Sequence, residues 1–229
     1  MKINCIQTGS SGNCYEIIDN SGNSIIIEAG VSRQTYVKHR IGKEAPEMCL
    51  ISHSHMDHAQ YVGEFKAVMT VFLAQEQNTS QNWKAFGFKM KHGEGFSTAF
   101  IIKSLVENKF LFFGTDFEWL DDYENLFFAL KNYKVENFLI ECNYNDCLIH
   151  MKDVTEDMRK QCQRHLSDND VIRFIRKSEA KNPKIILIHG SNRLSADTYT
   201  KKYISSKLIN STVEVAVGVK NNQKNLFII

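Results

Sequence analysis

The sequence predicts an α/β fold in which helices cover mixed β-sheets, arranged in two layered halves. Early strand-like segments follow one another through short turn-forming stretches, whereas later ones alternate with helical patterns. Hydrophobic residues make up 43% and charged residues 24% of the 229 residues, which is ample for one large core. The chain has just two prolines and no Pro/Gly-rich linker or internal repeat, so we expect residues 1–229 to form a single domain.

Short apolar or alternating runs bounded by turn residues predict the strands. In chain order they cover residues 2–7, 14–18, 24–28, 48–51, 68–73, 99–104, 109–113, 137–141, 184–188, 213–217 and 225–229. The turn-like stretches Ser10-Ser-Gly-Asn13 and Asp19-Asn-Ser-Gly22 separate the first three, which favours antiparallel pairing among them.

Helical periodicity predicts the remaining elements. One helix begins after residue 58 and covers 59–66, and others cover 123–131, 153–165, 170–177 and 196–208. Ser167 and Asp170 form a Ser-x-x-Asp pattern, which indicates a capping box at the start of the fourth of these helices.

The stretch Ile51-Ser-His-Ser-His-Met-Asp-His58 is the most informative segment for function. It holds His53, His55, Asp57 and His58 directly after a predicted buried strand. Imidazole nitrogens and carboxylate oxygens are metal ligands, and so dense a cluster has enough of them for two metal ions. The alternative is a His-rich loop that merely caps a helix.

Three further residues stand where a predicted strand ends and a loop begins. They are His92 in Lys91-His-Gly-Glu-Gly95, Asp116 after an apolar run, and His189 at the end of another. Each alone would more often be structural than functional. Their shared placement indicates that they complete a metal site, because binding crevices form outside the carboxyl ends of strands in α/β sheets.

At this point the pattern resembles the metallo-β-lactamase superfamily over nearly the whole chain. The resemblance implies a four-layer αβ/βα sandwich with mixed sheets, and a site for two divalent metal ions. Zn²⁺ suits the ligands best, with Mn²⁺ or Fe²⁺ as alternatives. The resemblance assigns the ligands as His53, His55 and His92 for the first metal, Asp57, His58 and His189 for the second, and Asp116 as the bridge.

Finer matches resemble the phosphodiesterase branches of that superfamily. Thr8-Gly-Ser-Ser-Gly-Asn13, Glu141-Cys-Asn143 and His165-Leu-Ser167 are similar to motifs of the YycJ-like nucleases, relatives of ribonuclease Z. The same neighbourhood includes the phage anti-Pycsar proteins, which hydrolyse cyclic mononucleotide second messengers. The resemblance thus implies a metallo-hydrolase that attacks a phosphorus with metal-bound hydroxide.

Two residues have predicted catalytic roles. Asp57 is a ligand that also orients the nucleophile, and His165 donates a proton to the leaving oxygen or contacts the phosphate. For His165 the alternative is a helix C-terminal histidine that compensates exposed carbonyls.

Other polar residues are predicted to contact the substrate. Ser10, Ser11 and Asn13 offer hydroxyl, amide and backbone groups, although a plain tight turn explains them equally well. Asn143 is placed with them, and it could instead hold a nearby loop. Tyr15, Tyr144 or Trp119 could stack on a base, with a place in the core as the alternative.

The substrate prediction remains divided. Compact length and a net charge of +2 favour a small phosphodiester, a 3′,5′-cyclic mononucleotide in anti-Pycsar-like immune evasion, over a long polyanion. The alternative is a nuclease acting on single-stranded nucleic acid, which needs a basic groove. A metal-free binding protein on the same scaffold is a third reading, disfavoured by seven intact ligand positions.

Location and assembly are further expectations. No apolar run reaches the length of a membrane span and the N-terminus lacks signal-peptide features, so we expect a cytoplasmic protein without membrane contact. The six cysteines form no Cys-x-x-Cys pair, which favours reduced, partly buried thiols. A homodimer is implied by the family resemblance only.

Overall fold

The computed structural model describes residues 1–74, 77–191, 194, 197–216 and 225–229. The chain divides into two compact units whose segments alternate along the sequence. Unit 1 comprises residues 1–87, 100–109 and 216–229, and unit 2 comprises residues 88–99 and 110–215. The expectation of a single domain stays a prediction.

The first sheet is mixed and, among the described residues, has six strands. Its order is β13 (Asn225–Ile228), β1 (Lys2–Gln7), β2 (Cys14–Ile18), β3 (Ser24–Ile27), β4 (Cys49–Ile51) and β5 (Val71–Leu73). The strands from β13 to β3 pair antiparallel, whereas β3, β4 and β5 pair parallel. The predicted antiparallel pairing of the first three strands is therefore confirmed.

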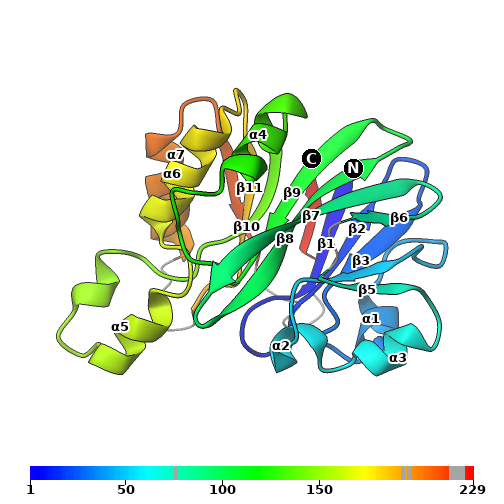
Figure 1. Cartoon of the computed structure of the whole chain (residues 1–229), viewed down its shortest axis with the longest axis horizontal. Coiled ribbons are helices and arrows are strands. Elements are labelled where there is room, and N and C mark those ends of the chain that lie inside the picture. The colour runs from blue at the N-terminus through cyan, green and yellow to red at the C-terminus, as the bar shows by residue number, and fades with distance from the viewer. Residues whose placement is uncertain (75–76, 192–193, 195–196, 217–224) are drawn as a thin grey trace. The chain divides into compact units, whose positions relative to one another are not determined.

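Three short helices accompany this sheet in unit 1, namely α1 (Arg33–His39), α2 (Met56–Ala59) and α3 (Val62–Lys66). Ser32 caps α1 by accepting a hydrogen bond from the backbone N–H of Thr35 at 3.2 Å. Tyr36 of α1 and Phe65 of α3 meet edge to face, with ring centroids 5.8 Å apart. Figure 1 shows these helices together beside the blue and cyan strands. Both rings belong to a buried apolar cluster that also includes residues of β3 and β4, so burial holds these helices on the strands.

The second sheet is also mixed. Among the described residues its order is β12 (Thr212–Val215), β11 (Lys184–Ile188), β10 (Asn137–Glu141), β9 (Lys109–Gly114), β8 (Gly95–Ser104), β7 (Trp83–His92) and β6 (Gln77–Thr79). The four strands from β9 to β12 run parallel. The interior residues of β9, β10 and β11 are almost continuously apolar, as strands covered on both faces require.

Helices α4 (Glu124–Asn132), α6 (Asp168–Ser178) and α7 (Asp197–Lys207) belong to unit 2 and lie beside β10 and β11 in Figure 1. Phe174 of α6 is fully buried and its ring lies 4.8 Å from that of Phe112 and 5.1 Å from that of Phe127. The predicted capping box at Ser167 and Asp170 is present at the start of α6. Packing and capping together fix the loop that precedes α6, which carries His165. A 3₁₀ turn η1 (Leu148–His150) and α5 (Glu156–Cys162) come before that loop.

Some elements differ from the sequence-based expectations. The helix predicted over 59–66 is two short helices, α2 and α3, and the strands β6 and β7 and the helix α1 were not predicted. Strand β7 carries three lysines among its apolar residues and α1 buries just one side chain, so neither has a clear hydrophobic periodicity. Val217 and Ala196, at the ends of predicted elements, lie outside the described residues.

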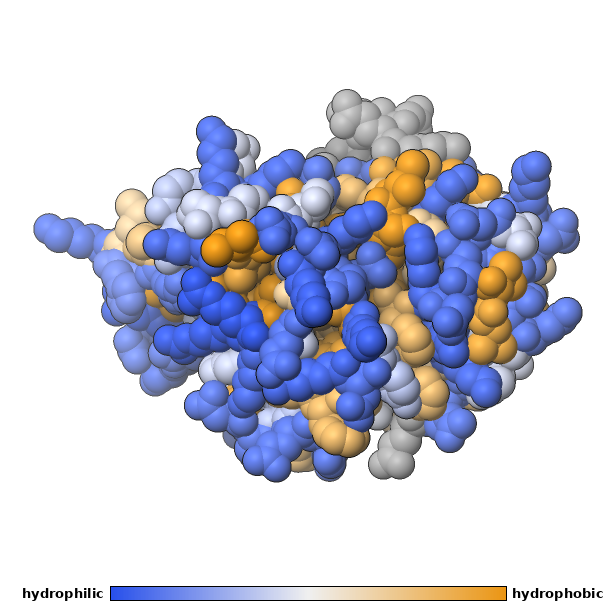
Figure 2. All heavy atoms as spheres, turned by 90° about the horizontal axis from the view of Figure 1, so that it is seen from above, coloured by the Kyte–Doolittle hydropathy of each residue, from blue (hydrophilic) through white to orange (hydrophobic). Residues whose placement is uncertain are grey.

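The surface and the thiols agree with the composition. Figure 2 shows hydrophilic residues interspersed with short hydrophobic patches on the face that it draws. In the part of the chain that the structure describes, no helix has the length and apolar character needed to cross a bilayer. All six cysteines are free thiols and five of them are buried, as expected. Burial raises the pKa of Cys14 and Cys49 well above the usual range, so these thiols stay protonated.

Candidate metal centre

The first four predicted ligands lie where β4 ends and α2 begins, in unit 1. The ring centroid of His53 lies 4.4 Å from that of His55 and 4.4 Å from that of His58. His58 is fully buried, and the side chain of Asp57 is 23% exposed. The turn therefore gathers three imidazoles and a carboxylate within one small volume. We call His53, His55, Asp57 and His58 ligand set 1.

Hydrogen bonds from the neighbouring strand ends hold this turn. The backbone N–H of Asn13 donates to the Asp57 carbonyl at 2.7 Å, and that of Gly30 donates to the Asn13 carbonyl at 2.9 Å. The backbone N–H of Ala29 donates to the His58 carbonyl at 2.7 Å. Because Asn13 precedes β2 and Ala29 follows β3, pairing of these strands brings both to the end of β4. Residues far apart in sequence thus shape the ligand-bearing turn.

In unit 2, three polar side chains follow or end neighbouring parallel strands. Asp116 follows β9, Glu141 ends β10 and His189 follows β11. Since β9, β10 and β11 are adjacent and parallel, their carboxyl ends meet at one edge of the sheet. There, His189 Nδ1 lies 3.0 Å from Asp116 Oδ1 and 3.5 Å from Glu141 Oε2. Asp116 and His189 are predicted metal ligands, as is His92 at the end of β7, which also faces Asp116. We call His92, Asp116 and His189 ligand set 2.

Two more imidazoles face Asp116. His92 Nε2 lies 3.8 Å from Asp116 Oδ2, and His165 Nδ1 lies 3.8 Å from Asp116 Oδ1. The Nδ1 atom of His92 lies 3.1 Å from the carbonyl oxygen of Arg164. A carbonyl oxygen can only accept, so Nδ1 of His92 carries the proton and Nε2 offers its lone pair. His92 is thereby prepared as a ligand through Nε2.

Glu141 is a further residue of this site. The sequence analysis named it as part of the motif Glu141-Cys-Asn143 but assigned it no role. Its side chain is fully buried. One oxygen, Oε1, accepts from the backbone N–H groups of Phe117 at 2.9 Å and Leu166 at 3.2 Å, and the other, Oε2, lies 3.1 Å from His165 Nδ1. Burial is the largest single influence and raises the pKa of this carboxyl, but the charge and hydrogen bond of His165 and the hydrogen bond of His189 together outweigh it and lower the pKa to about 2. Glu141 is therefore an anion that holds the loops after Asp116 and before α6.

His165 and Glu141 perturb one another in opposite directions. Burial is the largest single influence and lowers the pKa of His165, but the charge and hydrogen bond of Glu141 and the charge of Asp116 together outweigh it, so the net shift is upward. His165 follows the C-terminus of α5, where its backbone N–H donates to the Cys162 carbonyl at 2.9 Å, but its ring is paired with the buried Glu141 carboxylate. Asp116, Glu141, His165 and His189 together offer four ligand atoms that all lie within 4.8 Å of one another.

Three of the residues at these strand ends have a left-handed backbone. Glu28, which follows β3, has φ 69°, Asp116 has φ 54° and His189 has φ 55°. Such values are unfavourable for residues other than glycine and concentrate at functional sites, where surrounding contacts maintain them.

The structure also locates the predicted substrate contacts. Ser10 and Ser11 are exposed, and Ser11 Oγ accepts from Gln7 Nε2 at 2.7 Å. Asn13 is fully buried, and Asn143 Nδ2 donates to the His189 carbonyl at 3.0 Å. Both asparagines hold ligand-bearing loops, and contact of any of the four with substrate stays a prediction.

Of the three aromatic residues predicted to stack on a base, Trp119 is half-buried and neither tyrosine has an accessible ring. Tyr15 is fully buried and Tyr144 is 7% exposed, so both belong to the core, as the alternative interpretation expected.

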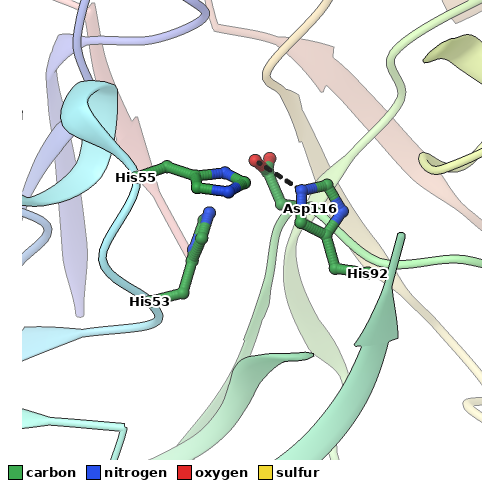
Figure 3. Close-up of side chains that lie close together, drawn as sticks. All are labelled: His53, His55, His92 and Asp116. Atoms are coloured by element: carbon green, nitrogen blue, oxygen red, sulfur yellow. Dashed lines mark ion pairs between the residues drawn. The ribbon is translucent and has the colours of Figure 1, made fainter. Parts of the chain in front are cut away.

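The residues present fit a metal site. Figure 3 draws two members of each ligand set. In ligand set 1 the rings of His53 and His55 meet edge to face, and in ligand set 2 a dashed line marks the ion pair between His92 and Asp116. Imidazole nitrogens and carboxylate oxygens are the ligands that Zn²⁺ takes. Asp116 is 3% exposed and faced by three imidazoles, and a buried anion needs such compensation.

Comparisons with known proteins give structural likeness only. No protein-family model and no curated protein sequence matches the chain. The structure is similar to the metallo-β-lactamase fold protein YhfI from Bacillus subtilis, with a TM-score of 0.72 and 13% identity over 99% of each chain. It is also similar to unliganded yeast PDE1, with a TM-score of 0.66 and 10% identity over 95% of this chain and 97% of that one. Human tRNase Z, short form, matches with a TM-score of 0.65 and 12% identity over 100% of this chain and 99% of that one.

These similarities define the class of fold. The chain has the α/β metallo-β-lactamase fold with two mixed sheets, which confirms the predicted fold class. The identities are low, and the matched structures do not resolve a branch within that superfamily. Function must therefore be argued from the site's own residues.

Proposed function

We propose that this protein is a metal-dependent phosphodiesterase in which ligand sets 1 and 2 together bind two divalent metal ions. The observation that carries the proposal is the buried Asp116 carboxylate, which is faced by the imidazoles of His92, His165 and His189. Each of its two oxygens would be available to a different metal ion, as the proposed bridging role requires. The cluster of His53, His55, Asp57 and His58 supplies the remaining ligands.

Zn²⁺ is the metal we favour, because its ligands are typically imidazole and carboxylate, and Mn²⁺ or Fe²⁺ are the alternatives. When bound, two divalent cations supply Lewis-acid stabilisation of a phosphoryl group and a nucleophile at neutral pH. In that arrangement Asp57 orients the nucleophile, because its side chain is partly exposed while its backbone is held by Asn13.

His165 has the role of proton donor to the leaving oxygen. Its Nδ1 atom faces Glu141 Oε2 at 3.1 Å, and a carboxylate can only accept, so the Nδ1 proton is held there. The side chain is 17% exposed, which leaves Nε2 as the atom that meets a substrate. The Glu141 carboxylate raises the pKa of His165 and so favours the protonated ring that a general acid needs.

Replacing His165 with glutamine tests this role through the leaving group. We expect kcat/KM for a 3′,5′-cyclic mononucleotide to fall about 10²- to 10⁴-fold, because its alkoxide leaving group needs a proton. For bis(4-nitrophenyl) phosphate, whose phenolate leaves unprotonated, we expect a loss below about 10-fold. The matched control is His150→Gln, which changes an exposed histidine of η1. Equal losses on both substrates would contradict proton donation.

A 3′,5′-cyclic mononucleotide is the substrate that we favour. The net charge of +2 argues against strong attraction to a long polyanion. An exposed aromatic ring, Phe96, follows His92 in the β7–β8 hairpin and offers a surface for a base. Hydrolysis of a cyclic nucleotide messenger in immune evasion is the corresponding biological role.

A nuclease acting on single-stranded nucleic acid is the second candidate. The observation in its favour is the set of cations near His92 in unit 2. Lys89 Nζ lies 3.7 Å from the ring centroid of Phe96, Lys91 belongs to the same strand, and Arg164 approaches Gly93 closely. Cations gathered beside an exposed aromatic ring are typical of single-strand binding.

A substrate panel separates the two candidates. Metal-loaded protein is assayed with 3′,5′-cyclic mononucleotides and with single-stranded DNA and RNA, at about 50 mM and about 200 mM salt. We expect the highest kcat/KM for a cyclic mononucleotide, with weak salt dependence. Equal or better turnover of a polynucleotide, with steep loss at the higher salt, would contradict the cyclic-nucleotide proposal and favour the nuclease. Protein with Asp116→Asn, purified in parallel, controls for contaminating nucleases.

A further inference from the structure

Glu28 is a second fully buried glutamate at a strand end, and it belongs to unit 1. It follows β3, and its carboxylate oxygens each lie 3.3 Å from the backbone N–H of Ser52, which donates to them. Its Oε1 atom also lies 3.5 Å from Nδ1 of His58. A buried carboxylate is strongly unfavourable unless charge or hydrogen bonds compensate it. The ring of His58 is the side chain that faces it at ion-pair distance.

The other nitrogen of His58 has a neighbour whose hydrogen-bonding direction is fixed. His58 Nε2 lies 3.1 Å from Nδ2 of Asn13. The orientation of the Asn13 amide is determined, because its Oδ1 accepts from the backbone N–H of Gly9 at 2.9 Å. Nδ2 is therefore the amide nitrogen, a group that only donates. It follows that Nε2 of His58 accepts and carries its lone pair.

Asp57 does not reverse this assignment. Its Oδ2 atom lies 3.2 Å from His58 Nε2, and it also accepts from Asn13 Nδ2 at 3.3 Å. Asn13 Nδ2 also lies 3.3 Å from the backbone carbonyl oxygen of Asp57, and the shortest of its three contacts is the one to His58 Nε2. The proton of a neutral His58 ring is then on Nδ1, on the side of Glu28.

We propose that Glu28 is the positioning residue of His58: it retains the Nδ1 proton and so presents the Nε2 lone pair to a divalent cation. The inference rests on the proposed function, in which His58 is a metal ligand. Histidines that bind metals almost always donate their other N–H to a carboxylate, a carbonyl or water, and removing that partner lowers metal affinity about 10- to 100-fold. In the metal-free protein the Asn13 amide donates a hydrogen bond to the Nε2 lone pair, and a bound cation would take the place of that hydrogen bond.

Glu28→Gln removes the charge with almost no change in shape. We expect one Zn²⁺ equivalent to bind about 10- to 100-fold more weakly in competition with a chromophoric chelator, while the other binds as in wild type. The matched control is Glu16→Gln, because Glu16 is also fully buried and lies on the neighbouring strand β2. Its carboxylate accepts from Asn4 and Tyr36 side chains, so its loss tests general destabilisation. Thermal unfolding of both variants measures that destabilisation directly.

The tautomer of His58 gives a readout that a purely structural role would not change. In metal-free wild-type protein labelled with ¹⁵N-histidine, NMR long-range correlations should assign the proton of His58 to Nδ1. In Glu28→Gln the Nε2–H form should become populated. An Nε2–H tautomer in wild type would overturn the inference, even if the variant fails to fold.

The two proposals fail in different ways. Equal Zn²⁺ affinity in wild type and Glu28→Gln would overturn the role of Glu28 and leave the proposed function untouched. Tight Zn²⁺ binding by wild type, with a loss in Glu28→Gln but no turnover of any phosphodiester, would contradict the proposed function and support the role of Glu28.

Discussion

Asp116→Asn is expected to abolish hydrolysis of every substrate and to reduce the bound metal from two equivalents to one or fewer. An amide cannot bridge two cations as a carboxylate does, and three imidazoles lose the anion that they face. Loss of an outer-shell partner lowers activity about 10- to 100-fold, so loss of a shared ligand should exceed about 100-fold. Asparagine tolerates the φ of 54° at this position, which separates the charge effect from backbone strain.

Metal content by elemental analysis and kcat/KM on the substrate panel measure this effect. Asp121→Asn is the matched control, because the Asp121 side chain is 91% exposed and pairs with Lys177 at 3.9 Å. That variant should retain full metal content and activity. An Asp116→Asn protein with two bound metals and near wild-type turnover would refute the assignment of Asp116 as the bridge.

Gly30→Ala is expected to have the largest effect on stability. A Cβ atom on Gly30 would lie 1.8 Å from the carbonyl oxygen of Asp57 and 2.5 Å from the backbone nitrogen of Asn13. Both atoms belong to the backbone contacts that hold ligand set 1, so neither has a free side chain that could move aside. We expect the free energy of unfolding to fall by about 3 kcal/mol or more, the upper range for overpacking.

Urea unfolding compares this variant with Gly63→Ala. Gly63 lies in α3, and a Cβ atom there meets nothing within 4 Å, so the same substitution should change stability by less than about 1 kcal/mol. Zn²⁺ titration of folded Gly30→Ala should show weaker binding, because Asp57 and His58 are displaced together. A Gly30→Ala protein as stable as Gly63→Ala would refute the close packing of this turn.

Local patterns in the sequence predicted much of the fold. The core strands have strongly apolar runs, and β1, β2, β10 and β11 appear within a residue of their predicted ends. The capping box of α6 was predicted because it depends on residues three positions apart. The strand β7 and helix α1 were missed, because lysines interrupt one and a single buried tyrosine anchors the other.

At the site, too, local patterns predicted the residues that are neighbours in the chain or stand at apolar strand ends. The sequence placed His53, His55, Asp57 and His58 together because they are neighbours in the chain, and it placed Asp116 and His189 at strand ends. It assigned no role to Glu141 and did not mark Glu28. A glutamate at the end of an apolar strand could have been noticed in both places, since a charged group there requires a partner.

The sequence by itself determined which chemical groups are present and at which strand ends they stand, because composition, periodicity and short spacing depend on neighbours in the chain. The tertiary structure alone decided which nitrogen of His58 and of His165 carries a proton, since Asn13, Glu28 and Glu141 are separated in sequence from the rings that they orient. It alone decided that Gly30 admits no side chain and that Glu28, Asp116 and His189 adopt left-handed backbones. These properties arise where strands distant in the chain pair and end together, and no local pattern encodes them.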